Sequence, residues 1–428
     1  MKYFINYMIR LLVISDIHLW ALPSECDKYY PMRKKMLDDI KDFCMTNGPI
    51  NHILISGDIA NTGSEQEYDK AYNFIQELCM SCNCKEYEVY VIPGNHDKNF
   101  SAPRSGLRHL LHGGLSNENI NSNDGFLDIV SNDDSTFKVL YEPFKAFNDF
   151  ATKLDSIEPL MAKGVDSRNT EQYNPKVDKM YFSKELSSLG DYKINLFGMN
   201  SALISDWYDI NDNGKGHKLF LSPLAYNADV NTEGNVNILM VHHPLENIRG
   251  GKEIQDELDK KFQIQIYGHL HKPASDNNNV IHIHSGAFQP PTEGYNVDYF
   301  SVYNIIELDI EENDGKDYLK LNLQVEKYNN ESFEHMKSES KTYTLKLKKH
   351  INRWENEKKE ENMEQTNLPS GVSIREVRHA FLQSQIAKKV MKDYKMYDEH
   401  KSISVNSVEF LKTMEMQGKL KELWDHLK

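Results

Sequence analysis

Short apolar runs alternate with helical patterns through the first three hundred residues of the chain. Between two of these runs, apolar residues recur at helical spacing from Tyr68 to Cys79. Ser64 and Glu67 form a capping-box pair that predicts the start of this helix. Strand–helix alternation of this kind predicts an α/β fold. The runs that predict strands are Leu11–Ser15, His52–Ser56, Glu88–Ile92, Lys193–Met199, Asn237–His242, Gln263–Tyr267 and Val280–Ser285.

The hydrophobic pattern changes its period after about residue 299. From Leu319 to Glu326 every second side chain is apolar, and the residues between them are polar. Strict alternation predicts an antiparallel strand with one face toward solvent. Tyr299–Ile310 and Thr342–Leu347 look similar, so we expect the main body to finish in a meander of antiparallel strands.

Three segments interrupt this regular organisation. Residues 98–190 contain stretches rich in Asn, Asp, Ser and Gly, and they are too long for a plain loop, so we expect an insertion or lid there. Residues 351–372 include a stretch rich in Glu, Lys and Asn, which predicts a polar linker. After it, Ser373 and Glu376 form a second capping-box pair, and two apolar stripes predict a helical hairpin. The expected domains are 1–350 for the main body, 351–372 for the linker and 373–428 for the helical C-terminal domain.

The predicted hairpin has more apolar surface than two helices of about twenty residues can cover against each other. Leu423, Trp424 and Leu427 all lie on one of its stripes. We therefore expect a homo-oligomer or another protein partner to contact these helices, in preference to packing within the chain.

Composition and charge narrow the class of protein. The chain has 428 residues, of which 39% are hydrophobic, and its formal net charge of −14 argues against a surface that coats nucleic acid. Residues 341–428 differ, because they hold 18 Lys and Arg against 13 Asp and Glu. Five cysteines, four of them between Cys44 and Cys84, are typical of a reducing compartment. No apolar run approaches the ~18 residues of a membrane span, so we expect a cytoplasmic protein.

Five polar blocks each follow directly on an apolar strand run, and open α/β sheets build their sites at that edge. The converging carboxylates, amide and imidazoles include no thiolate, and such a set suits Mn²⁺, Fe²⁺ or Zn²⁺. There are more donors than one ion needs, which predicts two ions that share a carboxylate, an arrangement used for phosphoryl chemistry. The blocks are Ser15-Asp16-Ile17-His18, Ser56-Gly57-Asp58, Pro93-Gly94-Asn95-His96-Asp97, Val241-His242-His243-Pro244 and Tyr267-Gly268-His269-Leu270-His271.

In order and residue type, these blocks resemble the calcineurin-like metallophosphoesterase superfamily, whose pattern is D-x-H, G-D, G-N-H-D/E, H and G-H-x-H. The resemblance covers about residues 11–310. It implies a two-sheet β-sandwich flanked by helices, with two metal ions at its rim. It also implies that one ion is held by Asp16, His18 and His271, the other by Asn95, His242 and His269, and that Asp58 bridges both.

The resemblance assigns further roles around these ligands. His96 would act as general acid or charge stabiliser, oriented by Asp97, and a metal-bridging hydroxide would be the in-line nucleophile. We expect His243, which neighbours a ligand, to have a supporting or structural role and not to bind a metal ion itself. We expect His282 and His284, which alternate after the fifth block, to be structural.

The His-His-Pro of the fourth block and the compact Gly-Asn-His-Asp of the third block most resemble bacterial members of the superfamily that are related to the cyclic-nucleotide phosphodiesterases. This similarity implies a phosphodiesterase that acts on nucleotide-type substrates. Three alternatives stay open: a DNA or RNA nuclease with a helical partner-binding tail, a phosphoprotein phosphatase, and a metal-bound scaffold without catalysis.

Overall fold

The structure is a computed structural model that describes residues 8–22, 26–99, 101, 105–117, 124–126, 139–154, 181–205, 218–289, 300–349, 368–369, 371–399 and 403–428. Almost all of the expected linker at 351–372 lies outside these residues, as does about half of the expected insertion at 98–190. Among the described residues, no helix has both the length and the apolar character needed to cross a membrane.

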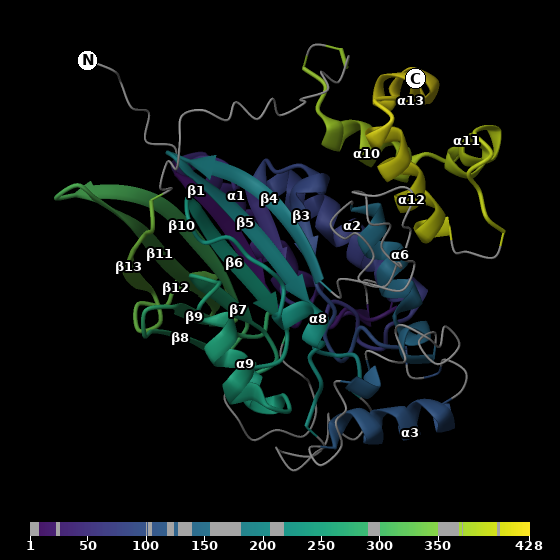
Figure 1. Cartoon of the computed structure of the whole chain (residues 1–428). Coiled ribbons are helices and arrows are strands. Elements are labelled where there is room, and N and C mark those ends of the chain that lie inside the picture. Colours follow the sequence, from purple (N-terminus) through teal and green to yellow (C-terminus); the bar gives the residue numbers. More distant parts are fainter. Residues whose placement is uncertain are drawn as a thin grey trace.

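The first sheet contains the strands that carry the first three polar blocks (Figure 1). Its parallel strands are β1 (Ile9–Ile14), β2 (His52–Ile55) and β3 (Val89–Val91). The predicted meander joins β1 through an antiparallel pairing. Its strands are β10 (Val302–Asn313), β11 (Lys316–Tyr328), β12 (Phe333–His335) and β13 (Lys341–Lys346), and the sheet order is β12-β11-β10-β1-β2-β3, with β13 on β11.

The second sheet carries the fourth and fifth blocks. Its order is β4-β5-β6-β7-β9-β8, in which β5, β6, β7 and β9 are parallel. The edge strands β4 and β8 were not predicted. Strand β4 lies within the segment 98–190 that was expected to be an insertion, and β8 contains Pro, Asp and Asn, which are uncommon in strands, and pairs only with β9. The strands are β4 (Tyr181–Leu189), β5 (Tyr192–Met199), β6 (Asn235–Val241), β7 (Ile264–Tyr267), β8 (Pro273–Asn277) and β9 (Ile281–Ser285).

Helices pack on both sheets, which confirms the predicted sandwich flanked by helices. On the first sheet lie α1 (Tyr30–Asn47) and α2 (Glu65–Cys82), and on the second α8 (Pro223–Tyr226) and α9 (Gly251–Leu258). The Ser64–Glu67 capping box begins α2 as predicted, whereas α1 was not predicted. Leu11, Leu12 and Val13 of β1 are fully buried in the core. Burial of such side chains contributes about 1.5–3 kcal/mol each, so the end of β1 is firmly placed.

Part of the expected insertion belongs to the core of the body. Helix α6 (Lys145–Lys153) buries Phe147 and Phe150, whose ring centroids lie 6.2 Å and 5.0 Å from the ring of Tyr68 on α2. Helix α3 (Ser105–Ser116) also falls within this segment. Residues 139–154 are therefore a packed element on α2.

The described residues of the C-terminal region, 371–399 and 403–428, contain four helices, where a hairpin of two was predicted. The first predicted helix is interrupted at Ser384, whose backbone is extended. The helices share their own core, in which Phe381, Phe410 and Leu423 are fully buried. They are α10 (Ile374–Gln383), α11 (Ala387–Asp393), α12 (Ile403–Met416) and α13 (Leu420–Leu427).

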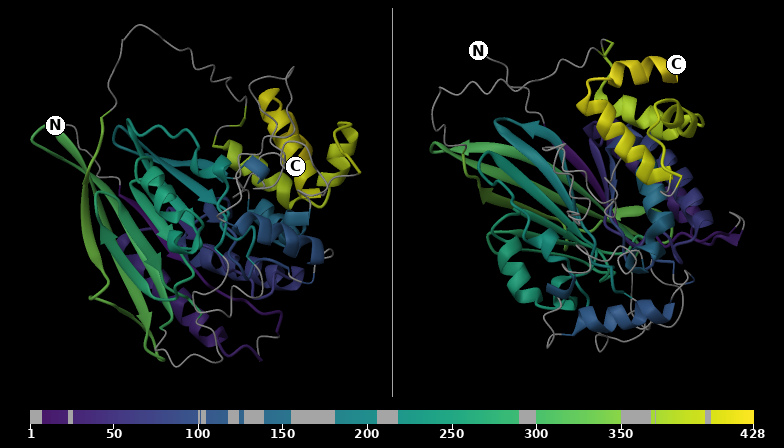
Figure 2. Two further views of the ribbon diagram at one scale, coloured as in Figure 1. Left: turned by 60° about the horizontal axis from the view of Figure 1, so that its bottom comes forward. Right: turned by 45° about the vertical axis from the view of Figure 1, so that its right-hand side comes forward.

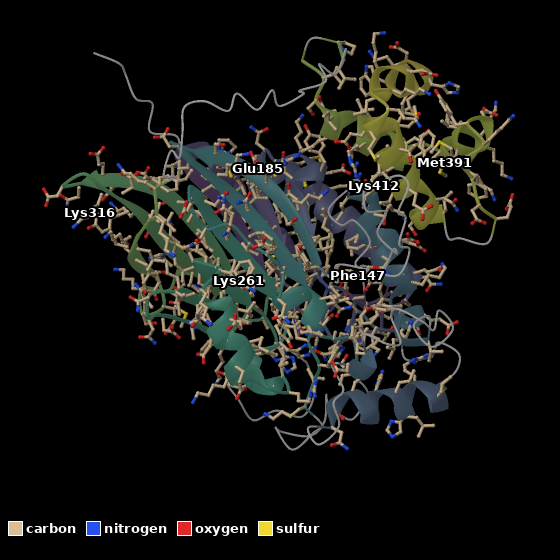
Figure 3. All side chains as sticks on the ribbon, viewed as in Figure 1. Phe147, Glu185, Lys261, Lys316, Met391 and Lys412 are labelled. Carbon is tan, nitrogen blue, oxygen red and sulfur yellow. The ribbon has the colours of Figure 1, made fainter. Side chains whose placement is uncertain are left out.

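These helices dock on the body of the same chain, and both views in Figure 2 show them beside it. Arg375 of α10 donates to both carboxylate oxygens of Glu88, at 2.6 Å and 2.7 Å, and to the carbonyl oxygen of Glu185 on β4. Figure 3 labels Glu185 there, and Met391 and Lys412 in the C-terminal helices. Gln383 donates to the carbonyl oxygen of Lys153 on α6. The apolar faces that prompted the expectation of a second copy are thus largely covered within one chain.

Candidate metal centre

The five polar blocks meet where the parallel strands of both sheets end. The backbone N–H groups of Ile17 and His18 donate to the carbonyl oxygen of Asp58, at 2.8 Å and 3.0 Å. The N–H of His269 donates to Oδ2 of Asp16 at 3.1 Å. These bonds tie the first block to the second and to the fifth. Blocks far apart in the sequence therefore form one site.

The backbone of this site adopts a conformation that side chains with a Cβ disfavour. Ten non-glycine residues in the described part of the chain have positive φ, and five of them are candidate ligands. Their φ angles lie between 46° and 66°. Such residues cost roughly 1–3 kcal/mol each and persist where the surroundings hold them, often at functional sites. The five are Asp16, His18, Asp58, His269 and His271.

Three glycines of the blocks allow close approach between loops. A Cβ at Gly94 would lie 2.2 Å from Oδ1 of Asp58, and one at Gly57 would lie 2.4 Å from Nδ1 of His242. A Cβ at Gly268 would lie 2.2 Å from the hydroxyl of Ser15. The glycines are therefore required by the packing of the ligands as well as by local turns.

Asp16, His18 and His271 form the first cluster. Oδ2 of Asp16 accepts hydrogen bonds from the Ser15 hydroxyl and from the N–H of His269. Its Oδ1 faces Nε2 of His271 at 3.1 Å and Nε2 of His18 at 3.8 Å. Both ring nitrogens of His18 are buried without a hydrogen-bond partner among the described residues. A buried, unpartnered imidazole beside a carboxylate fits a bound cation.

Burial and neighbouring charges shift the pKa values of residues in the first cluster. Burial raises the pKa of Asp16, but the hydrogen bond and charge of His271 outweigh it and hold this pKa below its ordinary value. Burial, followed by the neighbouring His96, lowers the pKa of His18 to about 3. His18 is therefore neutral at pH 7, which is the protonation state that binds a metal ion.

His242 and Asn95 form the core of the second cluster. Nδ1 of His242 donates to the carbonyl oxygen of Ser56 at 2.8 Å, since a carbonyl can only accept. Its Nε2 therefore faces Oδ1 of Asn95 at 3.2 Å and Oδ2 of Asp58 at 3.4 Å. Burial lowers the pKa of His242, but Asp58 outweighs burial and raises it to about 9. A divalent cation among these three atoms would take the place of that proton.

Asp58 lies between the two clusters. Its Oδ1 accepts the backbone N–H of His96 at 2.8 Å, and its Oδ2 lies 4.0 Å from Nε2 of His18 as well as 3.4 Å from His242. Burial raises the pKa of Asp58, but the surrounding imidazoles, His242 first, hold it well below its ordinary value. The potential ligand groups are Asp16–His18–His271, His18–Asp58–His96, Asp16–Asp58–His242 and His242–His243–His269.

The expectation that Asp97 orients His96 is wrong. Nδ1 of His96 lies 2.8 Å from the carbonyl oxygen of Asn61, and it must donate to that oxygen. The Asp97 carboxylate instead accepts from the N–H groups of Ala60 and Gly94, both at 2.9 Å, and from the hydroxyl of Tyr68 at 2.8 Å. The N–H of Ile59 also donates to it. Asp97 thus ties the third block to the loop after Asp58, and its hydrogen bonds in the described part of the chain go to groups other than the His96 imidazole.

Two backbone contacts that shape the site gave no sequence signal. Ser56 and Asn61 act through backbone carbonyls, which every residue possesses, so no side-chain pattern reveals them. His282 lies on the outer face of β9, where it contacts Asp276 at 3.0 Å. The ring of His284 stacks on Tyr267. Both of these contacts are with residues other than the candidate ligands, and the structural role of the two histidines stays a prediction.

Comparisons with known proteins come from sequence and from structure. A sequence profile described as calcineurin-like phosphoesterase matches residues 9–273. Vacuolar protein sorting 29 from Cryptosporidium parvum is 14% identical, over 80% of this chain and 99% of that chain, with a TM-score of 0.31. Vps29 from Entamoeba histolytica complexed with zinc is 13% identical, over 79% and 99%, with a TM-score of 0.30.

The sulfate thiohydrolase SoxB from Thermus thermophilus, in complex with glycerol, is 10% identical, over 79% of this chain and 56% of that chain, with a TM-score of 0.30. Structural likeness at this level says nothing about activity. No curated protein matches the chain.

Proposed function

The chain belongs to the calcineurin-like phosphoesterase family, and from this membership we propose that it is a dinuclear metal-dependent phosphodiesterase that acts on nucleotide-type substrates. The family relationship supports metal-dependent phosphoester hydrolysis in general. The nucleotide class of the substrate is proposed from residues exposed close to the ligands in the sequence and from the charge of the chain, and the diester class from the resemblance of the motifs to cyclic-nucleotide phosphodiesterases.

One observation carries the proposal of two ions. Several candidate ligands have their second polar atom occupied by a hydrogen bond, so the remaining atom faces the centre of the site. This holds for Oδ2 of Asp16, Oδ1 of Asp58 and Nδ1 of His242. We propose Asp16, His18 and His271 for one ion, Asn95, His242 and His269 for the other, and Asp58 for both. Nitrogen and oxygen donors together suit manganese, iron or zinc.

In this proposal the residues of the chain hold the metal ligands and the general acid in place, and the acid donates a proton. The two cations, when bound, activate water as the nucleophile and stabilise charge on the phosphoryl oxygens. His96 is held by its bond from Nδ1 to Asn61, so in the doubly protonated ring Nε2–H is left to give its proton to the leaving-group oxygen. The N–H of His96 also fixes Asp58, which keeps the acid at a constant place relative to the ligands.

The surface around the site supports a substrate with a flat or apolar part. Trp20 stands two residues after His18 and is 44% exposed, and Leu270 stands between His269 and His271 and is 46% exposed. An exposed indole can stack on a nucleobase, which is worth about 1–3 kcal/mol per base in proteins that bind single strands. A polynucleotide is less favoured, because the chain carries a net charge of −14.

A substrate panel tests the proposal. The metal-loaded protein is assayed with bis(p-nitrophenyl) phosphate, p-nitrophenyl phosphate, cyclic nucleotides, single-stranded DNA and a phosphopeptide. We expect the diester to be hydrolysed faster than the monoester, and cyclic nucleotides to be substrates. Preference for DNA would favour the nuclease, and preference for the phosphopeptide would favour the phosphatase. Two bound ions with no turnover on any substrate would favour the scaffold.

A further inference from the structure

His243 connects the candidate metal centre to the end of β5. Its side chain is buried, and its Nε2 lies 3.1 Å from Oδ1 of Asn95. On the other side of the ring, Nδ1 lies 2.9 Å from the hydroxyl of Ser201. The backbone N–H of His243 donates to the same hydroxyl at 3.1 Å. Three residues from three loops thus form one buried chain of hydrogen bonds.

The donors and acceptors of this chain can be assigned in order. The amide oxygen of Asn95 only accepts, so Nε2 of His243 carries the hydrogen. In a neutral ring Nδ1 then accepts, and the donor is the Ser201 hydroxyl. The oxygen of that hydroxyl accepts the N–H of His243. Every polar atom of the His243 ring and of the Ser201 hydroxyl is satisfied in this single arrangement.

We propose that His243 and Ser201 are positioning residues that hold the Asn95 amide with its oxygen toward His242 and Asp58. The oxygen and nitrogen ends of an amide have nearly the same shape, but only the oxygen has a lone pair for a cation. A hydrogen donor at Nε2 of His243 selects the oxygen. This inference rests on the proposed function, since it assumes that Asn95 binds the second ion.

The expected consequence is a change in metal affinity with little change in the first cluster. Loss of a residue that orients a ligand typically costs 10–100-fold in metal affinity. We expect His243→Phe, which keeps a ring and removes the donor, to weaken the second ion by about this factor. Ser201→Ala should weaken it less, because the imidazole keeps its contact with Asn95. Asp16 of the first cluster is held by the Ser15 hydroxyl and by the N–H of His269, so binding of the first ion should stay as in the wild type.

Conservative variants separate positioning from packing. The His243 ring also contacts His242 and His269, with ring centroids 4.7 Å and 4.6 Å away, so a loss of packing could mimic the effect. Ser201→Thr keeps the hydroxyl and should restore affinity that Ser201→Ala loses. His243→Gln keeps an N–H donor and should bind the second ion more tightly than His243→Phe.

The experiment is a titration of the chelator-treated full chain with Mn²⁺ alone, followed by bound-metal analysis, with thermal unfolding as a check of folding. Weaker second-ion binding in His243→Phe and Ser201→Ala, with rescue in the conservative variants, is the expected result. Wild-type affinity in His243→Phe and in Ser201→Ala would overturn the inference alone. If His243→Phe does not fold, Ser201→Ala and Ser201→Thr decide: weaker second-ion binding in the first and restored binding in the second support the inference, and wild-type affinity in Ser201→Ala overturns it. A wild-type chain that binds only one ion would overturn the proposed function and this inference with it.

Discussion

The backbone N–H of His96 donates a 2.8 Å hydrogen bond to Oδ1 of Asp58. This bond decides which oxygen of the carboxylate is available, because only Oδ2 then faces Nε2 of His242 and Nε2 of His18. The proposed acid and the proposed bridging ligand are therefore placed by the same contact. A change in the loop that carries His96 should therefore alter the position of the Asp58 carboxylate.

Replacement of Asp58 should have the largest effect on the metal centre. Asp58→Asn removes the negative charge that offsets two neighbouring dications, which repel each other at short distance. We expect fewer than two bound ions per chain and loss of nearly all hydrolysis, measured by metal analysis and turnover of bis(p-nitrophenyl) phosphate. Asp69→Asn is the control, because Asp69 is exposed on α2. Full metal occupancy with wild-type turnover in Asp58→Asn would refute the dinuclear assignment.

His96 should affect rate and leave metal content unchanged. His96→Ala removes a positioned acid, which is typically worth 10²–10⁴-fold in rate. The defect should shrink for substrates with a nitrophenolate leaving group, which departs without a proton. Turnover of aryl and alkyl diesters by wild type and variant measures this difference. Equal defects for both leaving groups would contradict the acid role.

A methyl group at position 94 should disturb Asp58 directly. The added Cβ of Gly94→Ala would lie 2.2 Å from Oδ1 and 2.6 Å from the backbone nitrogen of Asp58. Overpacking typically costs about 1–3 kcal/mol, so we expect a lower melting temperature and weaker metal binding. Gly106→Ala on α3 is the matched control, because its Cβ would meet no atom within 4 Å. If both variants melt and bind metal alike, the close approach of Gly94 to Asp58 is not important.

Docking of the C-terminal helices should depend on the pair of Glu88 and Arg375. Arg375→Ala removes three hydrogen bonds, two to the Glu88 carboxylate and one to the Glu185 carbonyl, and should weaken docking by about 1–3 kcal/mol. We expect faster hydrogen exchange in α10, with metal content unchanged. Lys421→Ala is the control, since Lys421 pairs within α13. Unchanged exchange in Arg375→Ala would show that other contacts hold the helices.

The same pair gives docking a pH dependence. Burial raises the pKa of Glu88, but His52 and Arg375 outweigh burial and hold it below its ordinary value of 4.5. A lowered carboxyl pKa stabilises the folded state above 4.5, and this contribution is lost as pH falls through the folded value. The protection of the α10 amides, which is their exchange rate relative to the intrinsic rate at the same pH, should therefore fall in acid for the wild type. Glu88→Gln should remove this part of the pH dependence, and an identical acid profile in that variant would disprove it.

Local patterns in the sequence were enough to predict where the polar blocks lie and which type of sheet carries them. Asp16, Asp58 and Asn95 each follow an apolar run, and such runs become buried parallel strands whose ends share one edge. The alternation from Leu319 to Val325 predicted an antiparallel strand, and the Ser64–Glu67 pair predicted a helix start. These features depend on neighbours in the sequence, and a local pattern is therefore enough to reveal them.

The tertiary structure alone decided which group each site residue contacts. His96 contacts the Asn61 carbonyl, 35 residues away, and His243 contacts Ser201, 42 residues away. A backbone carbonyl has no residue signature, and a serine far along the chain has no fixed spacing to its partner. The covering of the C-terminal helices by their own core and by α6 was decided in the same way. Hydrogen bonds and packing between distant segments depend on how the two sheets close, and that closure is a property of the whole core.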